Sequence, residues 1–268
     1  MMKKFVFDGL SYAKNVIDDH NIDEKNANEH MMLLAKYNFH VEKMDDTSNY
    51  HSIIQYMSTY WEGFMEADHQ QKIEDFIKNA HKFGFKSVES IKITRKELNF
   101  ITSLGSIRLE KVAFVLLCIA KYECYYHDEP KYWICWPLNA ISKLARVHVA
   151  RAENLKLFRE LVLAGAIESN SSGTNLYEHI LFVSDSKDDE VVLELSENDY
   201  KELAYTYLYY KNGFSGYVHC EKCGRLVKQK SNRQKFCDEC AAKNEQENIK
   251  NRVRRYRCKC NDLETQSK

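Results

Sequence analysis

Hydrophobic residues in the first 90 positions recur at helical spacing, and short polar stretches separate the runs. The runs lie at residues 10–17, 31–38, 53–61 and 73–80. Spacings of three and four place the apolar side chains of each run on one face of a helix. The polar stretch 45–49, Asp-Asp-Thr-Ser-Asn, supplies N-cap residues for the third helix. The pattern predicts four helices and an all-helical N-terminal domain.

A different pattern begins near residue 91, where strand-like segments alternate with helices. Ile91–Thr94 is typical of a strand, and Thr94 with Glu97 forms a Thr-x-x-Glu capping box that starts a helix. The elements expected after it are a long helix (108–126), a short strand (133–136), a two-turn helix (138–145), a tight turn (146–149), a second helix (150–164) and two strands (166–168 and 177–183). Gly165 is expected to end the second helix as its C′ residue.

This order of elements resembles the winged helix-turn-helix family over about residues 106–184. In Phe158–Ile167 a glycine ends the helix and an apolar residue opens the next strand, which is similar to the end of the recognition helix and the start of the wing. The resemblance implies that the core-facing residues of this segment are Leu155, Phe158, Leu161 and Ile167. It implies that the residues facing a DNA groove are Arg151, Asn154, Lys156 and Arg159, because such helices read DNA with their N-terminal half.

Two features of this segment depart from a DNA-binding winged helix. The hairpin region 168–186 contains no Lys or Arg, whereas DNA-binding wings contact phosphate through such residues. Leu157, Val162 and Leu163 make the second helix more apolar than a groove-reading helix needs. Winged helices of this apolar kind often dock on protein. DNA reading and protein docking therefore both stay open for this helix.

A strand, a tyrosine-rich helix and a pair of glycines follow. Val191–Leu195 is typical of a strand, and Ser196 with Asp199 is expected to cap the helix behind it. The abundant tyrosines of that helix are more typical of a packing element than of a base-stacking surface. Gly213 and Gly216 predict a hinge before about residue 218.

Four cysteines form the most informative motif of the chain. Cys220-x-x-Cys223 and Cys237-x-x-Cys240 are two knuckles with thirteen residues between them. This spacing lets four thiolates surround one tetrahedral Zn²⁺ ion. Gly224, directly after the second ligand, supplies the positive φ that such a knuckle usually needs. We therefore predict a zinc ribbon with one structural Zn²⁺, and the alternative is four unrelated reduced cysteines.

The charge of the chain is neutral overall but unevenly placed. The sequence has 39 Lys and Arg against 39 Asp and Glu. Residues 219–268 hold 14 basic and 7 acidic side chains, a net of +7, and residues 1–218 hold 25 and 32, a net of −7. The basic residues assigned to nucleic-acid binding are Arg225, Lys228, Lys230, Arg233 and Lys235 in the cysteine loop, and Lys250, Arg252, Arg254, Arg255 and Arg257 after it. A basic zinc module on an acidic body is typical of binding to a phosphate backbone, and the alternative is a solvated charge run on a structural tail.

Residues 241–257 are expected to continue as a helix behind the second knuckle. Ile249, Val253 and Tyr256 lie at i, i+4 and i+7, which gives the helix one narrow apolar stripe. Basic residues flank this stripe on both sides. The stripe is able to dock on the rest of the protein, with the arginines facing phosphates, or to pair with the same helix of a second copy. The sequence does not choose between these arrangements.

Motifs of common enzymes are missing from the sequence. It contains no P-loop, no His-Glu-x-x-His, no Gly-x-Ser-x-Gly and no deaminase pattern, and no His lies between the knuckles as an HNH-type nuclease requires. A non-enzymatic protein is therefore expected. With no membrane-spanning run, no signal peptide and an odd number of cysteines, 9, we expect a cytoplasmic protein rather than a disulfide-bonded secreted one. Cys258 and Cys260 receive no role, because Cys-x-Cys alone is a weak signal.

Several segments resemble uncharacterised ribbon-tailed proteins from phages and integrative elements of Gram-positive bacteria. The matching segments are Phe7–Gly9, Ile93–Leu98, Leu109–Lys121, Cys220–Gly224 and Arg233–Cys240. The resemblance implies a mobile-element origin, in a bacterial or phage-infected cell, and implies no particular activity.

The sequence thus predicts an α+β, mainly α protein of three parts. These are an N-terminal helical domain (1–90), a winged-helix-like domain with an appended strand and helix (91–217), and a zinc ribbon with a basic helical tail (218–268). The expected function is zinc-dependent binding of nucleic acid, duplex DNA in particular, in transcription regulation or replication. The alternative is an interaction adaptor whose acidic helical body binds another protein and whose zinc ribbon is purely structural.

Overall fold

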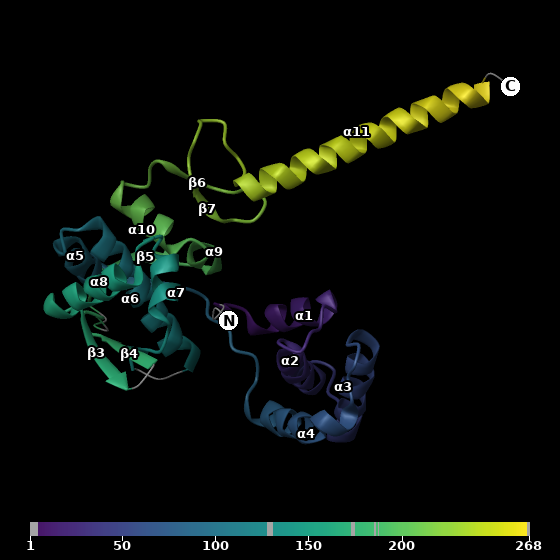
Figure 1. The fold of residues 1–268 in the computed structure, drawn as a ribbon, viewed down its shortest axis with the longest axis horizontal. Helices are drawn as coiled ribbons and strands as arrows, with labels where there is room; N and C mark the ends of the chain where they lie inside the picture. Colours follow the sequence, from purple (N-terminus) through teal and green to yellow (C-terminus); the bar gives the residue numbers. More distant parts are fainter. Residues whose placement is uncertain (1–4, 128–130, 173–174, 185, 187, 267–268) are drawn as a thin grey trace. The chain divides into compact units, whose positions relative to one another are not determined.

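The structure is a computed structural model and describes residues 5–127, 131–172, 175–184, 186 and 188–266. Within these residues the protein is mainly helical, with three small antiparallel sheets (Figure 1). The chain divides into two compact units between Ser90 and Ile91. The α+β, mainly helical class predicted from the sequence is therefore confirmed.

The first unit consists of the four predicted helices. They are α1 (Gly9–Asp19), α2 (Ala27–His40), α3 (Asp46–Tyr60) and α4 (Glu66–Lys82). Asp45 caps α3 as expected, because its carboxylate accepts the backbone N–H of Ser48 at 2.7 Å. The apolar faces of the helices meet in one core, in which Met31, Ile53 and Met57 are fully buried. The helical spacing of the apolar residues therefore serves packing in this unit.

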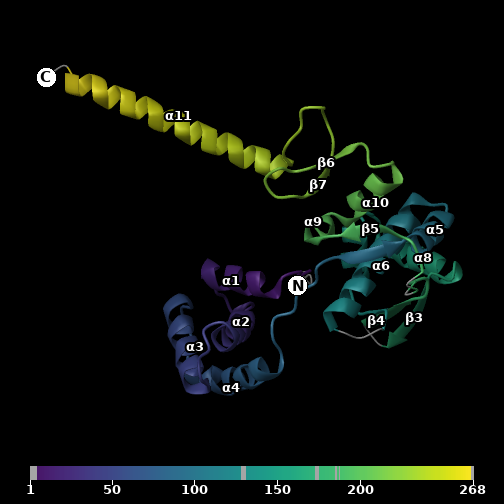
Figure 2. The same cartoon turned by 180° about the vertical axis from the view of Figure 1, so that it is seen from behind.

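The second unit contains the other elements, which Figure 2 shows from behind. In chain order they are β1 (Ile91–Thr94), α5 (Arg95–Ser103), α6 (Ile107–His127), β2 (Trp133–Ile134), α7 (Leu138–Leu144), α8 (Arg151–Leu163), β3 (Ile167–Ser172), β4 (Asn175–Ile180), β5 (Val191–Leu195), α9 (Glu197–Tyr200), α10 (Leu203–Lys211), β6 (Tyr217–His219), β7 (Leu226–Lys228) and α11 (Asp238–Gln266). The predicted order of helices and strands is confirmed. The pairing of β1 with β5 was not predicted, because the two strands lie far apart in the sequence and periodicity carries no information on partners.

Helix α6 is the central element of the second unit. Every residue from Val112 to Ala120 is fully buried. Helices α5, α7, α8 and α10 contact α6, and so do strands β1, β2 and β4. A helix that is apolar on all sides must be covered on all sides, which explains why the surrounding elements form one unit around it.

Helix α8 packs through a different face from the one expected. Leu157, Phe158 and Leu161 are buried, whereas Leu155 is 48% exposed. The prediction that Leu155 faces the core is therefore wrong. The buried positions follow the spacings of three and four that one helix face requires, and Leu155, about 100° around the helix from buried Asn154, lies at the border of this face.

The end of α8 is formed as predicted. Gly165 has a φ of 70°, and its N–H donates to the carbonyl of Val162 at 3.0 Å. The N–H of Ala166 donates to the carbonyl of Leu161 at 2.9 Å. These two bonds form a Schellman motif, which turns the chain out of the helix and into β3. Together with β4 and β2, this strand forms the sheet of order β2-β4-β3.

Candidate metal centre

The first cysteine knuckle lies in the turn between β6 and β7. The two strands pair antiparallel, with His219 opposite Leu226. The N–H of Cys220 donates to the carbonyl of Arg225 at 2.9 Å. Gly224 has a φ of 69°, as predicted, and its N–H closes the turn on the carbonyl of Cys220 at 2.8 Å. The positive φ lets the chain reverse directly after the second sulfur.

The second knuckle lies at the start of α11. Cys237 immediately precedes this helix, and Cys240 lies in its first turn. The N–H of Ala241 donates to the carbonyl of Cys237 at 2.9 Å, so the first turn of the helix fixes the spacing of the two sulfurs. A rigid turn and a helix start therefore each supply one pair of thiols. We call residues 217–240 the cysteine hairpin.

The four sulfurs meet at one point. The Sγ atoms of Cys220, Cys223, Cys237 and Cys240 all lie within 4.8 Å of one another. Those of Cys223 and Cys237 are 3.8 Å apart, too far for a disulfide. Four sulfurs placed at about 2.3 Å around a tetrahedral metal are separated by about 3.8 Å, so the cluster fits one four-coordinate ion. Two of the four ligands are buried, with Cys220 2% and Cys237 3% exposed.

The protonation of the free thiols shows why the cluster suits a cation. Burial acts to raise the pKa of Cys220, but backbone N–H groups near its sulfur lower that pKa to about 6. Hydrogen bonding to Cys237 raises the pKa of Cys240 to about 12, and burial and the neighbouring sulfurs add to this shift. Once one thiol of the cluster is ionised, ionisation of a second thiol is therefore less favourable. A divalent cation removes this conflict because it stabilises all four thiolates together.

A site of four protein sulfurs has a limited chemistry. Four thiolates fill a tetrahedral shell and leave no position for an activated water, so the site would be structural. Soft thiolate ligands in this geometry suit zinc or iron and disfavour magnesium and calcium. The cysteines would therefore hold the turn and the helix start in a fixed relation.

Three of the five basic residues in the cysteine loop are neutralised by acidic neighbours. Their ion pairs are Arg225 with Glu239 at 3.2 Å and Glu202 at 3.8 Å, Lys230 with Asp238 at 2.7 Å, and Lys235 with Glu221 at 3.2 Å. Lys228 and Arg233 are exposed, and they form no ion pair with any residue that the structure describes. The loop is therefore less available to an anion than its sequence indicates.

The basic residues of α11 are in a different situation. Lys250, Arg252 and Arg254 are exposed and form no ion pair within the described part of the chain. Ile249 and Val253 of the predicted apolar stripe are each 45% exposed. The side chains of Tyr256, Arg255 and Arg257, and those of Cys258 and Cys260, lie outside the described residues. Free positive charge is thus concentrated on α11 rather than in the loop.

The cysteine hairpin packs against α9 and α10. Leu226 on β7 is fully buried. The ring of Tyr217 on β6 lies 5.4 Å from the ring of Tyr205 on α10, measured between centroids. The side chain of Lys201 donates to the carbonyl of Cys223 at 3.3 Å. Tyr205 and Tyr217 therefore act in packing, and the cysteine hairpin is held against α9 and α10.

One of the four α8 residues expected to face DNA is buried. Arg151, Lys156 and Arg159 are exposed, but Asn154 is only 7% exposed, and its Oδ1 accepts the hydroxyl of Ser142 at 2.6 Å. The assignment of Asn154 to a groove-facing surface is therefore wrong. Its position belongs to the same helix face as Leu157 and Phe158, and the hydrogen bond joins α8 to α7.

Comparison with known proteins gives no further assignment. The chain matches no protein-family model, no curated protein and no solved structure. None of the described helices combines the length and the apolar character that crossing a membrane requires. The functional argument consequently depends on the site itself.

Proposed function

We propose that the protein is a non-enzymatic nucleic-acid-binding protein in which a structural zinc ribbon presents α11 to the phosphate backbone of duplex DNA. The observation that carries this proposal is a set of exposed basic residues on α11, Lys250, Arg252 and Arg254, that have no acidic partner among the residues whose side chains the structure describes. This helix begins at the four-cysteine cluster. Arg255 and Arg257 add two further positive charges to the same helix. Unpaired cations at this density attract a polyanion.

A metal bound by the four cysteines would fix the start of α11 relative to the hairpin turn. Cys240 would bind the ion from the first turn of α11, so the ion connects the helix to the hairpin turn. The hairpin in turn packs on α10. The rest of the chain, residues 1–218, has a net charge of −7 and would repel phosphate. The strongly basic part of the protein is therefore the stretch 250–259 of α11, which contains six basic and no acidic residues, and a bound metal would control the position of the helix start.

Helix α8 is a second, weaker candidate for DNA contact. The order α7, α8 and the β3–β4 hairpin supports the resemblance to a winged helix, and Lys156 and Arg159 are exposed. However, residues 168–186 contain no Lys or Arg, and Asn154 is buried. We therefore place the main phosphate contact on α11.

The alternative function is protein interaction through the same helix. The apolar side chains of Ile249 and Val253 are exposed on α11, next to the basic residues. A partner helix, from this or another protein, would cover such a stripe. Salt separates the two functions, because phosphate contacts release counterions and apolar contacts do not.

The test measures DNA affinity as a function of salt for a charge variant of α11. Replacing Arg252, Arg254, Arg255 and Arg257 by Gln removes four positive charges and keeps helix propensity. If all four contact phosphates, the slope of log K against log salt should flatten by about 3.6 units, at about 0.9 per contact. Metal content should be unchanged because no ligand is altered.

A matched control removes the same charge elsewhere. Replacing the exposed lysines of the first unit, Lys14, Lys25, Lys72 and Lys78, by Gln gives the same net charge. If both variants flatten the slope equally, the effect is one of net charge and the proposal is wrong. An unchanged slope for the arginine variant would assign α11 to protein interaction.

A further inference from the structure

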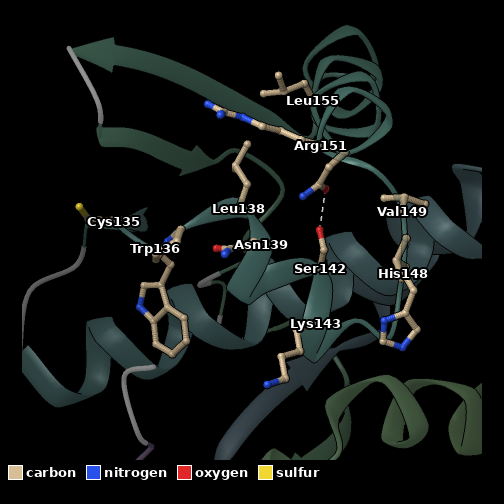
Figure 3. A pocket seen from close by; sticks show the side chains of 13 residues that line it. Cys135, Trp136, Leu138, Asn139, Ser142, Lys143, His148, Val149, Arg151 and Leu155 are labelled. Atoms are coloured by element: carbon tan, nitrogen blue, oxygen red, sulfur yellow. Dashed lines mark hydrogen bonds between the residues drawn. The ribbon is translucent and has the colours of Figure 1, made fainter. Parts of the chain in front are cut away.

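A groove opens on the second unit where α7 and α8 meet (Figure 3). Its volume is about 930 Å³, and it is partly open to solvent. Trp136, in the segment that precedes α7, and Leu138, the first residue of α7, form one wall, and α8 forms another with Arg151 and Leu155. The turn between the two helices adds His148. A groove of this size accommodates a small organic molecule.

The polar lining of the groove is basic. No Asp or Glu is among the lining residues, whereas Lys143, His148 and Arg151 are. Within the described residues Lys143 and Arg151 form no ion pair. Two nearby arginines are paired by contrast, Arg108 with Glu153 at 3.0 Å and Arg146 with Glu202 at 2.6 Å. The groove therefore retains positive charge that is neutralised elsewhere on the same surface, and this favours an anion.

Further donors lie beside Arg151. The side chain of Asn154 lines the groove although it is only 7% exposed. Its Oδ1 is occupied by Ser142, as the dashed line in Figure 3 marks, while its Nδ2 has no partner among the described residues. Helix α8 starts at Arg151, and no side chain caps its first N–H groups, because the N-cap is Ala150. A buried amide donor and a free helix start thus lie on the same wall as the guanidinium group.

The remaining walls are apolar. Trp136 is 3% exposed and its indole N–H donates to Glu123 at 2.9 Å, which fixes the ring. Leu138 and Leu155 line the groove from α7 and α8. A bare inorganic ion would leave these apolar surfaces in contact with water. A ligand with an anionic group and an apolar body would contact both kinds of wall.

We propose that this groove binds a small organic anion, a carboxylate or phosphate carried on an aromatic or aliphatic body, with Arg151 as the main partner of the anionic group. A DNA backbone fits the groove less well, because it is polar throughout and the adjacent hairpin region 168–186 offers it no Lys or Arg. The site is separate from the cysteine hairpin and from α11. The groove therefore adds a ligand-binding function that does not depend on the proposed DNA contact.

The test compares a charged probe with its neutral analogue on the full-length protein. Calorimetric titration with 2-naphthoate should give a Kd of about 1 mM, as expected for a ligand of this size. The amide 2-naphthamide has the same ring system and no charge, and should bind about tenfold more weakly. Arg151→Gln should weaken naphthoate binding about tenfold and leave naphthamide unchanged. Arg159→Gln, on the same helix but outside the groove, is the matched control and should change neither.

A second measurement locates the probe. Cys135 lines the groove and is exposed, so bound naphthoate should slow its alkylation by iodoacetamide, as measured by peptide mass spectrometry. Equal affinities for naphthoate and naphthamide, or an unchanged affinity in Arg151→Gln, would overturn the proposal. So would displacement of naphthoate by a short DNA duplex whose own affinity falls equally in Arg151→Gln, because the groove would then belong to a DNA-binding surface.

Discussion

The carboxylate of Glu97 lies 2.7 Å from the ammonium group of Lys121, and both side chains are buried in the second unit. Glu97 also accepts the backbone N–H groups of Thr94 at 2.8 Å and Ser184 at 2.9 Å. Lys121 donates to the carbonyl of Lys92 at 2.7 Å. Glu97, the acidic residue of the capping box of α5, therefore connects β1, α6 and the segment after β4. Charges this well paired are costly to separate, because the partner left behind is buried.

We predict that Lys121→Met destabilises the second unit by about 3–5 kcal/mol, since it leaves the Glu97 carboxylate buried without its cation. Unfolding in urea, monitored by circular dichroism, measures the change. Glu194→Gln is the control, because Glu194 forms an exposed pair with Lys92 at 4.0 Å and should cost about 1 kcal/mol or less. A cost for Lys121→Met as small as that of the control would contradict the importance of the buried pair.

Glu178 predicts a pH dependence of stability. It lies on the central strand β4, is 1% exposed, and its Oε2 has no hydrogen-bond partner within the described residues. Burial raises its pKa from 4.5 to about 7, although the hydroxyl of Ser169 opposes this shift. The folded protein therefore holds the proton more tightly than the unfolded chain does. The corresponding stability is fully present below pH 4.5 and is lost as pH rises through about 7.

Glu178→Gln should remove this dependence. At pH 8 the variant should be more stable than the parent by about 3 kcal/mol, because the parent must bury an ionised carboxylate. At pH 4.5 the two proteins should be about equally stable. Urea unfolding at both pH values measures the difference, and Glu194→Gln, a change at an exposed carboxylate that pairs with Lys92, is the control. If the variant were stabilised at pH 4.5 as much as at pH 8, ionisation of Glu178 would not be the cause of the gain in stability.

Local signals in the sequence predicted much of this structure. Three predicted motifs each depend on residues a few positions apart. They are the capping box of Thr94 and Glu97, the C′ residue Gly165 and the two cysteine knuckles. The capping box of Ser196 and Asp199 is also formed, with the N–H of Ser196 donating to Asp199 at 2.8 Å, but it starts the short helix α9, and the tyrosine-rich α10 begins separately at Leu203. Such motifs are visible in a sequence because their physical cause is contained in it.

Errors arose where distant segments decide the outcome. Leu155 and Asn154 were assigned to the wrong faces of α8, because two overlapping apolar stripes exist and packing on α6 selects one. The ion pairs of Arg225 with Glu202 and Glu239 were not predicted, and its assignment to nucleic-acid binding stays a prediction. No local pattern marks either glutamate as its partner. The groove at Arg151 was missed for the same reason, since its walls come from separate elements.

The contact of the hairpin with α9 predicts a specific effect at Gly224. A Cβ atom there would lie 2.5 Å from the side chain of Asn198, and the φ of 69° is already unfavourable for other residues. Gly224→Ala should therefore weaken metal binding, measured by competition with a chromophoric chelator. Gly216→Ala is the matched control, because it has a φ of 77° and no atom within 4 Å. Gly216→Ala therefore adds about 1 kcal/mol of backbone strain without a clash.

Adding Asn198→Ala to Gly224→Ala should recover part of the lost metal affinity, because it removes the clash and leaves the strain. The comparison separates the two causes. If the double variant binds metal no better than Gly224→Ala alone, the clash between the hairpin and α9 is not what lowers the metal affinity.

The metal itself should control both the hairpin and the helix it rests on. Cys240→Ser removes one of four ligands, so bound zinc should fall from about one equivalent to less than half in protein purified without chelator. Because the metal would hold the hairpin in shape, and buried Leu226 packs in it, amide exchange should accelerate in residues 217–240 and also in α10. The first unit should keep its protection, since it has a separate core.

Cys135→Ser, at an exposed cysteine outside the cluster, should change neither zinc content nor exchange. Faster exchange in the hairpin alone would mean that α10 is stable without it, and full zinc retention in Cys240→Ser would remove this cysteine from the site.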